Sequence, residues 1–284
     1  MNILQCLEIY GLDTTKIIKI ARHQDPRLNL EGIKKVYENN ELELYQSYQE
    51  EDQFNIGDYI ISCIGIENNQ SLFIGVYEVI GKSNIIGFPT NLNVSFQGKS
   101  KINSRYKYDM VRMKEFDEFK DRIVIRNSGR KWCQNAKNNP KEIVQILPKG
   151  YVRDFPGYYD FILTYEELKK IVLNEAANKV WHDTLSAVAG VYLIIDKTNG
   201  LQYVGSASGK NGIIGRWKEY TKNGHGGNLK LRELLIADPD YAKNFKFTIL
   251  QTLPKTLTQK EVVQKEKLYK EKLGSRAFGL NCNL

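Results

Sequence analysis

The residues best suited to chemistry lie in the last third of the chain and come in a fixed order. Two triplets, Gly190-Val191-Tyr192 and Tyr203-Val204-Gly205, are followed by Arg216, Tyr220, Glu266 and Asn281. A carboxylate can hold a hard divalent cation, because such ions prefer oxygen ligands. Arginine offers a phosphate two parallel donors, and nearby positive charge can lower the pKa of a phenol from about 10. Such a set suits metal-assisted hydrolysis of a phosphodiester.

Glu266 is the most informative of these residues because of its helical neighbours. Val262, Tyr269 and Leu273 lie at positions i−4, i+3 and i+7 from it, so the carboxylate shares an otherwise apolar helix face. A carboxylate on a buried face must be paired, protonated or bound to a cation. Pairing with a lysine and coordination of a divalent metal ion both satisfy this requirement, and the sequence leaves both open.

The other candidate residues also have structural interpretations. Arg216 and Tyr220 are four residues apart and so adjoin on one helix face, where a surface ion pair or a core hydroxyl is common. Tyr192 and Tyr203 could be aromatic core residues of a sheet. If residue 192 pairs with residue 203, both phenols face the same side. Asn281 could cap a terminal turn or tie the chain end to the site.

The elements that must position these residues form a compact α+β domain in the order ββααβα. Segments 190–196 and 201–205 read as a hairpin around a turn at 197–200. Helices are predicted near 213–221 and 229–237, a third antiparallel strand at 245–250, and a last helix from the capping box at Thr258 to Gly274.

The preceding part of the chain is richer in strand patterns. Helices are predicted around 15–21 and 30–37, and strands at 58–66, 72–80 and 121–126. We interpret residues 1–160 as a mixed, strand-rich domain, with a small barrel as one arrangement. A capping box at Thr164 and a helical stretch at 176–187 indicate a helical linker over 161–188, followed by the domain at 189–284.

The excess of positive charge lies in the C-terminal part of the chain. Residues 176–284 hold 17 Lys and Arg against 9 Asp and Glu, whereas the other 175 residues hold 24 of each. A basic surface favours polyanions, because each neutralised phosphate releases condensed counterions. The sequence has no long apolar segment of transmembrane type, no secretory signal, and four widely spaced cysteines without a zinc or disulfide pattern. We expect a cytoplasmic protein.

The ordered set over 190–281 resembles the GIY-YIG nuclease domain, with valine in place of isoleucine in both triplets. Arg216, Tyr220 and Glu266 match the family's arginine, its histidine or tyrosine, and its metal-binding glutamate. Gly279-Leu280-Asn281 resembles the terminal motif, and the run from Gly224 to Asn228 is similar to homing-type members.

The resemblance implies a DNA endonuclease that leaves 5′-phosphate and 3′-hydroxyl ends. Glu266 would hold Mg²⁺ or Mn²⁺, Arg216 would stabilise developing charge, and Tyr192 is our first choice as the base that activates water. Tyr203, Tyr220 and Asn281 complete the expected catalytic set. The candidate DNA contacts in this domain are Lys210, Lys218, His225 and Asn228.

Such a domain usually takes its specificity from an attached domain, here residues 1–160. Arg126, Arg130 and Trp132 form a basic and aromatic cluster that could contact DNA there. The layout resembles restriction-type enzymes acting on double-stranded DNA, and we expect a homodimer at least on DNA. A modification-dependent restriction nuclease, a structure-specific repair nuclease and a DNA-binding protein with a silent nuclease fold remain alternatives.

Overall fold

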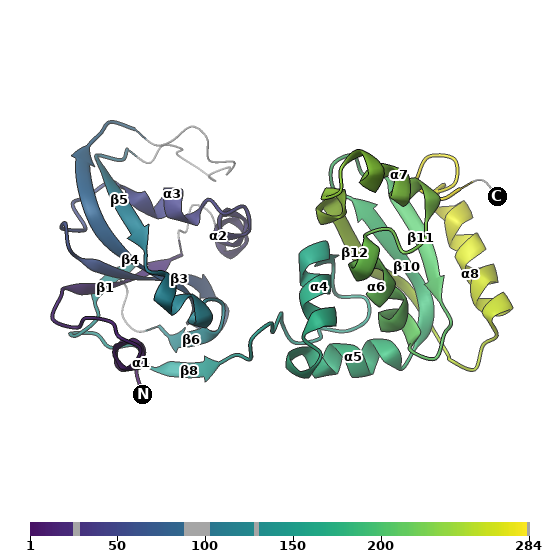
Figure 1. Cartoon of the computed structure of the whole chain (residues 1–284), viewed down its shortest axis with the longest axis horizontal. Helices are drawn as coiled ribbons and strands as arrows, with labels where there is room; N and C mark the ends of the chain where they lie inside the picture. Colours follow the sequence, from purple (N-terminus) through teal and green to yellow (C-terminus); the bar gives the residue numbers. More distant parts are fainter. Residues whose placement is uncertain (25–28, 88–102, 128–130, 283–284) are drawn as a thin grey trace. The chain divides into compact units, whose positions relative to one another are not determined.

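The computed structural model describes residues 1–24, 29–87, 103–127 and 131–282. The chain divides into two units, residues 1–147 and residues 148–284, each with its own hydrophobic core (Figure 1). No helix among the described residues is both long enough and apolar enough to cross a membrane.

The N-terminal unit is built on one curled, eight-stranded sheet. Its elements are α1 (Ile3–Ile9), β1 (Ile18–His23), α2 (Asn29–Glu38), α3 (Leu42–Ser47), β2 (Tyr48–Gln49), β3 (Tyr59–Ile66), β4 (Gln70–Asn84), β5 (Tyr106–Arg112), the 3₁₀ helix η1 (Lys114–Phe119), β6 (Ile123–Arg126), β7 (Cys133–Asn135) and β8 (Ile143–Ile146). The strand order is β2-β5-β4-β3-β1-β7, and β6 joins β4 to β8. No pairing among the described residues joins β2 to β7, so the sheet curls like half a barrel without closing.

Of the five elements predicted for this unit, four are present and one is wrong. The strands at 58–66, 72–80 and 121–126 are present as β3, β4 and β6, and the helix at 30–37 is α2. A helix was expected at 15–21, but most of this segment belongs to the strand β1. Ile18 and Ile20 are buried on one side of β1, and Lys19 pairs with Asp58 at 3.1 Å. This segment forms a strand because it pairs in parallel with β3, about forty residues away in the sequence. A pattern of neighbouring residues does not reveal such a distant contact.

The C-terminal unit has the predicted element order. It contains β9 (Leu163–Thr164), α4 (Tyr165–Leu173), the 3₁₀ helix η2 (Ala176–Asn178), α5 (Lys179–Ser186), β10 (Ala189–Asp196), β11 (Gln202–Ala207), α6 (Gly212–Asn223), α7 (Leu229–Ala237), η3 (Tyr241–Asn244), β12 (Phe245–Leu253) and α8 (Gln259–Lys272). From β10 onward the order is ββααβα. The antiparallel sheet runs β11-β10-β12-β9, so the short β9 adds a fourth strand to the three expected.

Helices cover both faces of this sheet (Figure 1), and each face packs in its own apolar layer. One face of β10 packs through Tyr192 and Ile194 against helices α4 to α7, in the main core of the unit. The opposite face packs through Val191 and Leu193 against α8, where Val262 is fully buried. Because β11 is the edge strand of the sheet, side chains on both of its faces lie next to its unpaired edge.

The segment expected as a linker is part of the C-terminal core. Thr164 caps α4 with the predicted capping box, in which Glu167 returns the bond to the Thr164 backbone. Leu168, Ile171 and Trp181 from α4 and α5 are buried in the core that also holds Tyr192. The boundary between the units therefore lies at residues 147 and 148, earlier than the boundary expected near residue 160.

This arrangement predicts which fragments fold alone. A fragment of residues 148–284 should unfold cooperatively on heating, whereas a fragment of residues 189–284 should not. The shorter fragment lacks the buried side chains of Leu163, Leu168, Ile171, Trp181 and Leu185. At about 1.5–3 kcal/mol each, their loss is comparable to the whole stability of a small domain. Circular dichroism melting would check this, and equal cooperativity of the two fragments would contradict it.

Candidate active site

The hairpin of β10 and β11 carries the two tyrosines on one face, as expected, but in a different register. Tyr192 lies opposite Gly205, and Tyr203 lies opposite Ile194. The observed register is therefore two positions away from the pairing of residues 192 and 203 that the sequence analysis considered. A shift by two keeps every side chain on its side of the sheet, so both tyrosines still face the main core.

The glycine of the second triplet makes room for the tyrosine of the first. A Cβ atom at Gly205 would lie 2.4 Å from Tyr192 Oη and 2.5 Å from Cζ. The Tyr192 phenol therefore lies directly on the backbone of β11. Gly190 is restricted in a similar way, because its Cβ would lie 2.5 Å from the carbonyl oxygen of Gln251, next to an irregularity in the pairing of β10 with β12.

Arg216, Tyr192 and Tyr220 form one connected polar network. Arg216 Nε donates to Tyr192 Oη at 3.2 Å, and the two phenol oxygens are 3.0 Å apart. The Arg216 guanidinium also stacks over the Tyr220 ring, 5.1 Å from its centroid. Because Arg216 and Tyr220 are at positions i and i+4 of α6, both side chains lie on one helix face and reach Tyr192.

The glycine-rich loop after α6 covers this network. Gly226 has a left-handed backbone, and a Cβ there would lie 2.7 Å from the Tyr220 ring. His225 Nδ1 accepts a bond from the Gly227 amide, and Asn228 caps α7 by accepting from the Leu231 amide at 3.0 Å. The predicted DNA contacts His225 and Asn228 therefore have structural roles in shaping this loop.

Burial, and not positive charge, dominates the titration of the enclosed phenols. Burial raises the pKa of Tyr192 well above its usual value, and Arg216 only partly opposes this effect. The pKa of Tyr220 is raised as well, first by burial and then by Tyr192 and Tyr203. The lowered phenol pKa suggested by the sequence is thus wrong for both residues, because the same packing that brings the arginine close also removes water.

Tyr203 differs from its two neighbours. Its hydroxyl makes no hydrogen bond to any residue of the described chain, and its side chain keeps some exposure on edge strand β11. Of the three phenols it is therefore the one free to bond a water molecule or a phosphate.

Glu266 lies on the opposite face of the sheet from these phenols. Its carboxylate accepts a bond from Ser206 Oγ on β11 and forms an ion pair with Lys270, one turn along α8. Lys270 was not identified from the sequence, although its i+4 spacing is the signal for such a pair. The helix face is less apolar than expected, because Leu273 lies at the helix end and is 39% exposed.

The phenol network and the Glu266 carboxylate contact consecutive residues of β11. The Tyr192 phenol lies against Gly205, and Glu266 bonds to the next residue, Ser206. Since side chains alternate along a strand, the phenol network and the carboxylate approach the same sheet edge from opposite faces. The sequence-predicted residues Tyr192, Tyr203, Arg216, Tyr220 and Glu266 are thus brought to one edge.

The divalent ion implied by the resemblance is compatible with this donor set. Glu266 and Ser206 supply a carboxylate and a hydroxyl oxygen at a partly accessible position, where the Glu266 side chain is 15% exposed. Within the described ranges no cluster of three or more His, Cys, Asp or Glu residues could hold a metal. The donors therefore suit an ion that keeps several waters and binds one carboxylate together with substrate phosphate. In this structure the positive charge of Lys270 compensates the negative charge of the Glu266 carboxylate.

Asn281 secures the end of the chain to β11. Its Nδ2 group donates to the Val204 carbonyl and its Oδ1 accepts from the Val204 amide, both at 2.9 Å. Ser275 Oγ also donates to Asn281 Oδ1, at 2.6 Å. This mimics a strand pairing with the edge of the sheet. In this structure Asn281 is a positioning residue for β11.

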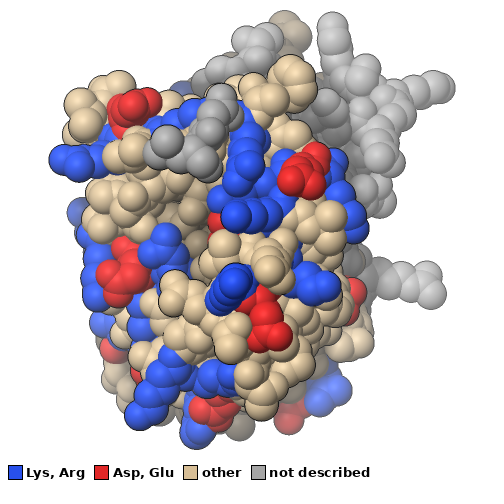
Figure 2. All heavy atoms as spheres, turned by 90° about the vertical axis from the view of Figure 1, so that its right-hand side faces the viewer, with Lys and Arg blue, Asp and Glu red and all other residues tan. Residues whose placement is uncertain are grey.

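The remaining predicted DNA contacts are spread over both units. Lys210 is exposed, and Lys218 pairs with Glu175 at 3.5 Å. Arg126 is exposed and pairs with Glu142 at 3.2 Å, Trp132 is half-buried, and Arg130 lies outside the described residues. Lys and Arg side chains outnumber acidic ones over the face shown in Figure 2. Exposed lysines of α8, including Lys260 and Lys265, belong to the basic C-terminal unit.

Comparison with known proteins identifies the class of this unit. Residues 188–281 match the family described as the GIY-YIG catalytic domain, so this part of the chain belongs to the GIY-YIG nucleases. The catalytic domain is that of a DNA endonuclease. The family predicted from the two triplets is confirmed.

Two solved structures are similar to the chain, and both are of the catalytic domain of homing endonuclease I-TevI. The first is 24% identical with a TM-score of 0.28, and the match covers 34% of this chain and 99% of that one. The second, a mutant of the same domain, is 25% identical with a TM-score of 0.28, covering 33% of this chain and 92% of that one. No curated protein matches the chain.

The contact of Tyr192 with Gly205 predicts a strong effect of one added methyl group. Gly205→Ala should destabilise the protein by about 1–3 kcal/mol, because the new Cβ overlaps the phenol and must displace it. Gly209→Ala is the matched control, since its Cβ would meet nothing within 4 Å and its φ is not positive. It should change stability by no more than about 0.5 kcal/mol. Urea denaturation of both variants checks this, and equal stabilities would disprove the contact.

The raised pKa values of Tyr192 and Tyr220 predict a loss of stability in alkali. The unfolded phenols ionise near pH 10, while the folded ones stay protonated. Their contribution is therefore complete below about pH 10 and decreases as the pH rises further, by up to about 1.4 kcal/mol per pH unit for each group. Denaturation between pH 8 and 11 should show a shallower decline for Tyr192→Phe than for the wild type. Identical declines would mean that Tyr192 titrates normally.

Proposed function

We propose that the protein is a magnesium-dependent restriction-type endonuclease that cuts double-stranded DNA to leave 5′-phosphate and 3′-hydroxyl ends. The observation that supports this best is the convergence of the Arg216–Tyr192–Tyr220 network and Glu266 on Gly205 and Ser206 of the edge strand. The excess of positive charge of the chain lies in the C-terminal unit, which favours a polyanionic substrate.

The roles follow from what each side chain can do at this edge. Arg216 donates to Tyr192 through its Nε, so its terminal amino groups would be the donors to a scissile phosphate. Its fixed positive charge would stabilise charge that develops on the phosphate. A divalent ion held by Glu266 would supply Lewis-acid neutralisation of the same group.

Tyr203 is the phenol we assign to the attacking water. A general base must reach the proton that it accepts. Tyr192 is fully buried and its pKa is raised, so we revise our first choice of Tyr192 as the base. Tyr192 and Tyr220 then act by positioning Arg216, and Asn281 acts by holding the strand that carries Tyr203.

The N-terminal unit is the proposed source of DNA specificity. A nuclease site that contacts mainly phosphates carries little sequence information, so base recognition must come from elsewhere. Cutting both strands from one active site per chain favours a homodimer on DNA. The defence role and a cytoplasmic location follow from this proposal. Sequencing the ends produced from methylated and unmethylated genomic DNA would separate sequence-specific from modification-dependent cutting.

The metal role of Glu266 predicts a separation of cutting from binding. Glu266→Gln should lower Mg²⁺-dependent plasmid cleavage by at least about a hundredfold, because the amide loses the charge that holds the ion. DNA binding should remain measurable. Glu271→Gln is the matched control, since Glu271 is exposed on the same helix α8.

Cleavage is measured by conversion of supercoiled plasmid to nicked and linear forms. Equal cleavage by the two variants would exclude Glu266 as the metal ligand. Absence of cleavage by the wild-type protein on unmodified, modified and branched DNA would favour a DNA-binding protein with a silent nuclease fold.

The proposed base predicts a difference between two phenol deletions. Tyr203→Phe should lower the cleavage rate by about 10²–10⁴-fold without changing stability, as expected for loss of a general base. Tyr192→Phe should lower both cleavage and stability, because it breaks the bonds to Arg216 and Tyr220. Cleavage rates and urea denaturation of both variants check this. A Tyr203→Phe enzyme with the wild-type rate would return the base role to Tyr192.

A further inference from the structure

Glu266, the candidate metal ligand, has a partner on each of its two carboxylate oxygens. Ser206 Oγ donates to Oε2, and the Lys270 ammonium pairs with Oε1. The two partners differ in charge. The neutral hydroxyl can stay beside a carboxylate that binds a cation, whereas the ammonium repels a second cation on the same carboxylate.

The ion pair of Glu266 and Lys270 is largely shielded from water. The Lys270 side chain is 16% exposed and the Glu266 side chain 15% exposed. The residues are at positions i and i+4 of α8, and the acidic residue is the one nearer the N-terminus, which is the favourable order for such a pair. Because water screens this pair weakly, the charge of Lys270 acts strongly on anything that binds Glu266.

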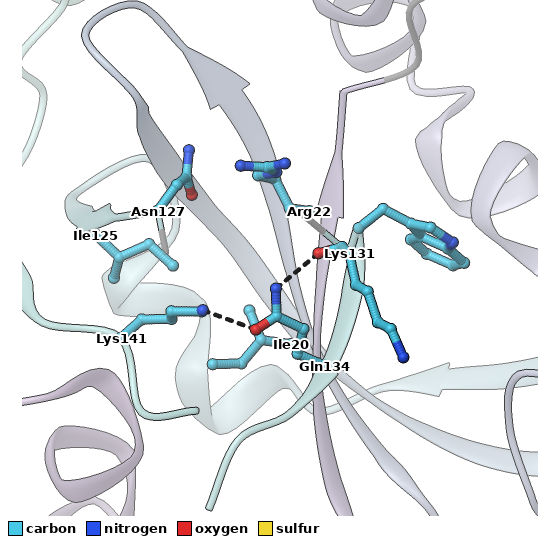
Figure 3. Close-up of a pocket in the computed structure, with 8 residues that line it drawn as sticks. Ile20, Arg22, Ile125, Asn127, Lys131, Gln134 and Lys141 are labelled. Carbon is cyan, nitrogen blue, oxygen red and sulfur yellow. Dashed lines mark hydrogen bonds between the residues drawn. The ribbon is translucent and has the colours of Figure 1, made fainter. Parts of the chain in front are cut away.

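Lys141 in the N-terminal unit is a shielded lysine of a different kind. It is 5% exposed, and its Nζ donates to Gln134 Oε1 at 3.0 Å. Gln134 donates in turn to the Lys131 carbonyl at 2.8 Å (Figure 3). Lys141 thus takes part in a series of hydrogen bonds within its own unit. Lys270 differs from it, because the partner of Lys270 is the residue that matches the family's metal-binding glutamate.

We propose that Lys270 is an internal counterion that competes with the divalent ion for Glu266 and so makes metal binding depend on bound DNA. When a DNA phosphate lies at the site, the Lys270 ammonium can pair with the phosphate, and Glu266 is then available to the ion. One ion pair is replaced by two, so the charges stay balanced. Without the phosphate, a divalent ion would meet the positive charge of Lys270 and also that of Arg216 at the same sheet edge.

This inference rests on the proposed role of Glu266 as a metal ligand and adds a form of regulation to it. Coupling between two ligands is reciprocal, so DNA should raise the affinity for the ion by the same factor by which the ion raises the affinity for DNA. The chain would then hold its metal ion mainly when substrate is bound.

The first experiment measures metal binding by the full chain without DNA, from the loss of the free Mn²⁺ signal in electron paramagnetic resonance. Lys270→Gln removes the competing charge, so it should bind Mn²⁺ about fivefold or more tightly than the wild type. Lys267→Gln is the matched control, because it removes the same charge from an exposed position of α8 next to Glu266. The control should bind as the wild type does. An unchanged affinity in Lys270→Gln would overturn the inference.

Two further substitutions at position 270 keep the test decisive. Lys270→Met also removes the charge and keeps an unbranched apolar stem, so it takes the place of Lys270→Gln where that variant fails to fold. Lys270→Arg keeps the charge and can hold the carboxylate with two parallel donors, so it should bind Mn²⁺ no more tightly than the wild type. Tighter binding by Lys270→Arg would show that charge is not the cause and would overturn the inference.

The second experiment measures the coupling by fluorescence anisotropy with duplex DNA, with and without Ca²⁺ at constant ionic strength. Glu266→Gln gives the general effect of the ion on DNA binding. Relative to that variant, Ca²⁺ should raise the DNA affinity of the wild type by about fivefold or more, and that of Lys270→Gln by less. Lys267→Gln should match the wild type. Equal coupling in the wild type and Lys270→Gln would overturn the inference.

Glu266→Gln also separates a failure of this inference from a failure of the proposed function. If this variant responds to Mn²⁺ and Ca²⁺ as the wild type does, Glu266 is not the metal ligand and both proposals fail. If it loses the response while Lys270→Gln matches the wild type, only the role of Lys270 is rejected. Absence of cleavage together with the expected coupling would reject the nuclease proposal alone.

Discussion

The contact between the Tyr192 phenol and the backbone of Gly205 is the constraint on which the candidate active site depends. The missing side chain at Gly205 lets the phenol cross over the edge strand, where its oxygen meets both Arg216 and Tyr220. Any larger residue would occupy that space. The tyrosine of the first triplet therefore packs against the glycine of the second, and neither residue can be interpreted without the other.

The edge position of β11 turns this fit into a site. An interior strand has a neighbouring strand on both sides, whereas β11 pairs with another strand, β10, on one side only. The phenol network reaches this edge from the side of α6, and Glu266 reaches it from α8 through Ser206. Asn281 pairs with Val204 and so holds the strand from outside. The helices α4 and α5 contribute by filling the core beneath Tyr192, which is why they belong to the catalytic unit.

The sequence predicted the C-terminal unit well because its signals are local. The capping boxes at Thr164 and Thr258 begin α4 and α8 as expected, and the hairpin turn separates two strands of clear alternation. The N-terminal unit was predicted less well where a strand depends on a distant partner. Because the segment of β1 was predicted as a helix, the alternation that buries Ile18 and Ile20 on one side of a strand was not recognised.

The sequence by itself determined the family, the order of elements and the identity of the polar residues, because short motifs and helical spacing are properties of neighbouring residues. Only the tertiary structure decided how those residues meet. It placed Glu266 across the sheet from the phenols and paired it with Lys270. It also buried Tyr192 so that its pKa rises where a nearby arginine alone would lower it. Register, burial and charge pairing depend on contacts between distant segments, and no local pattern encodes them.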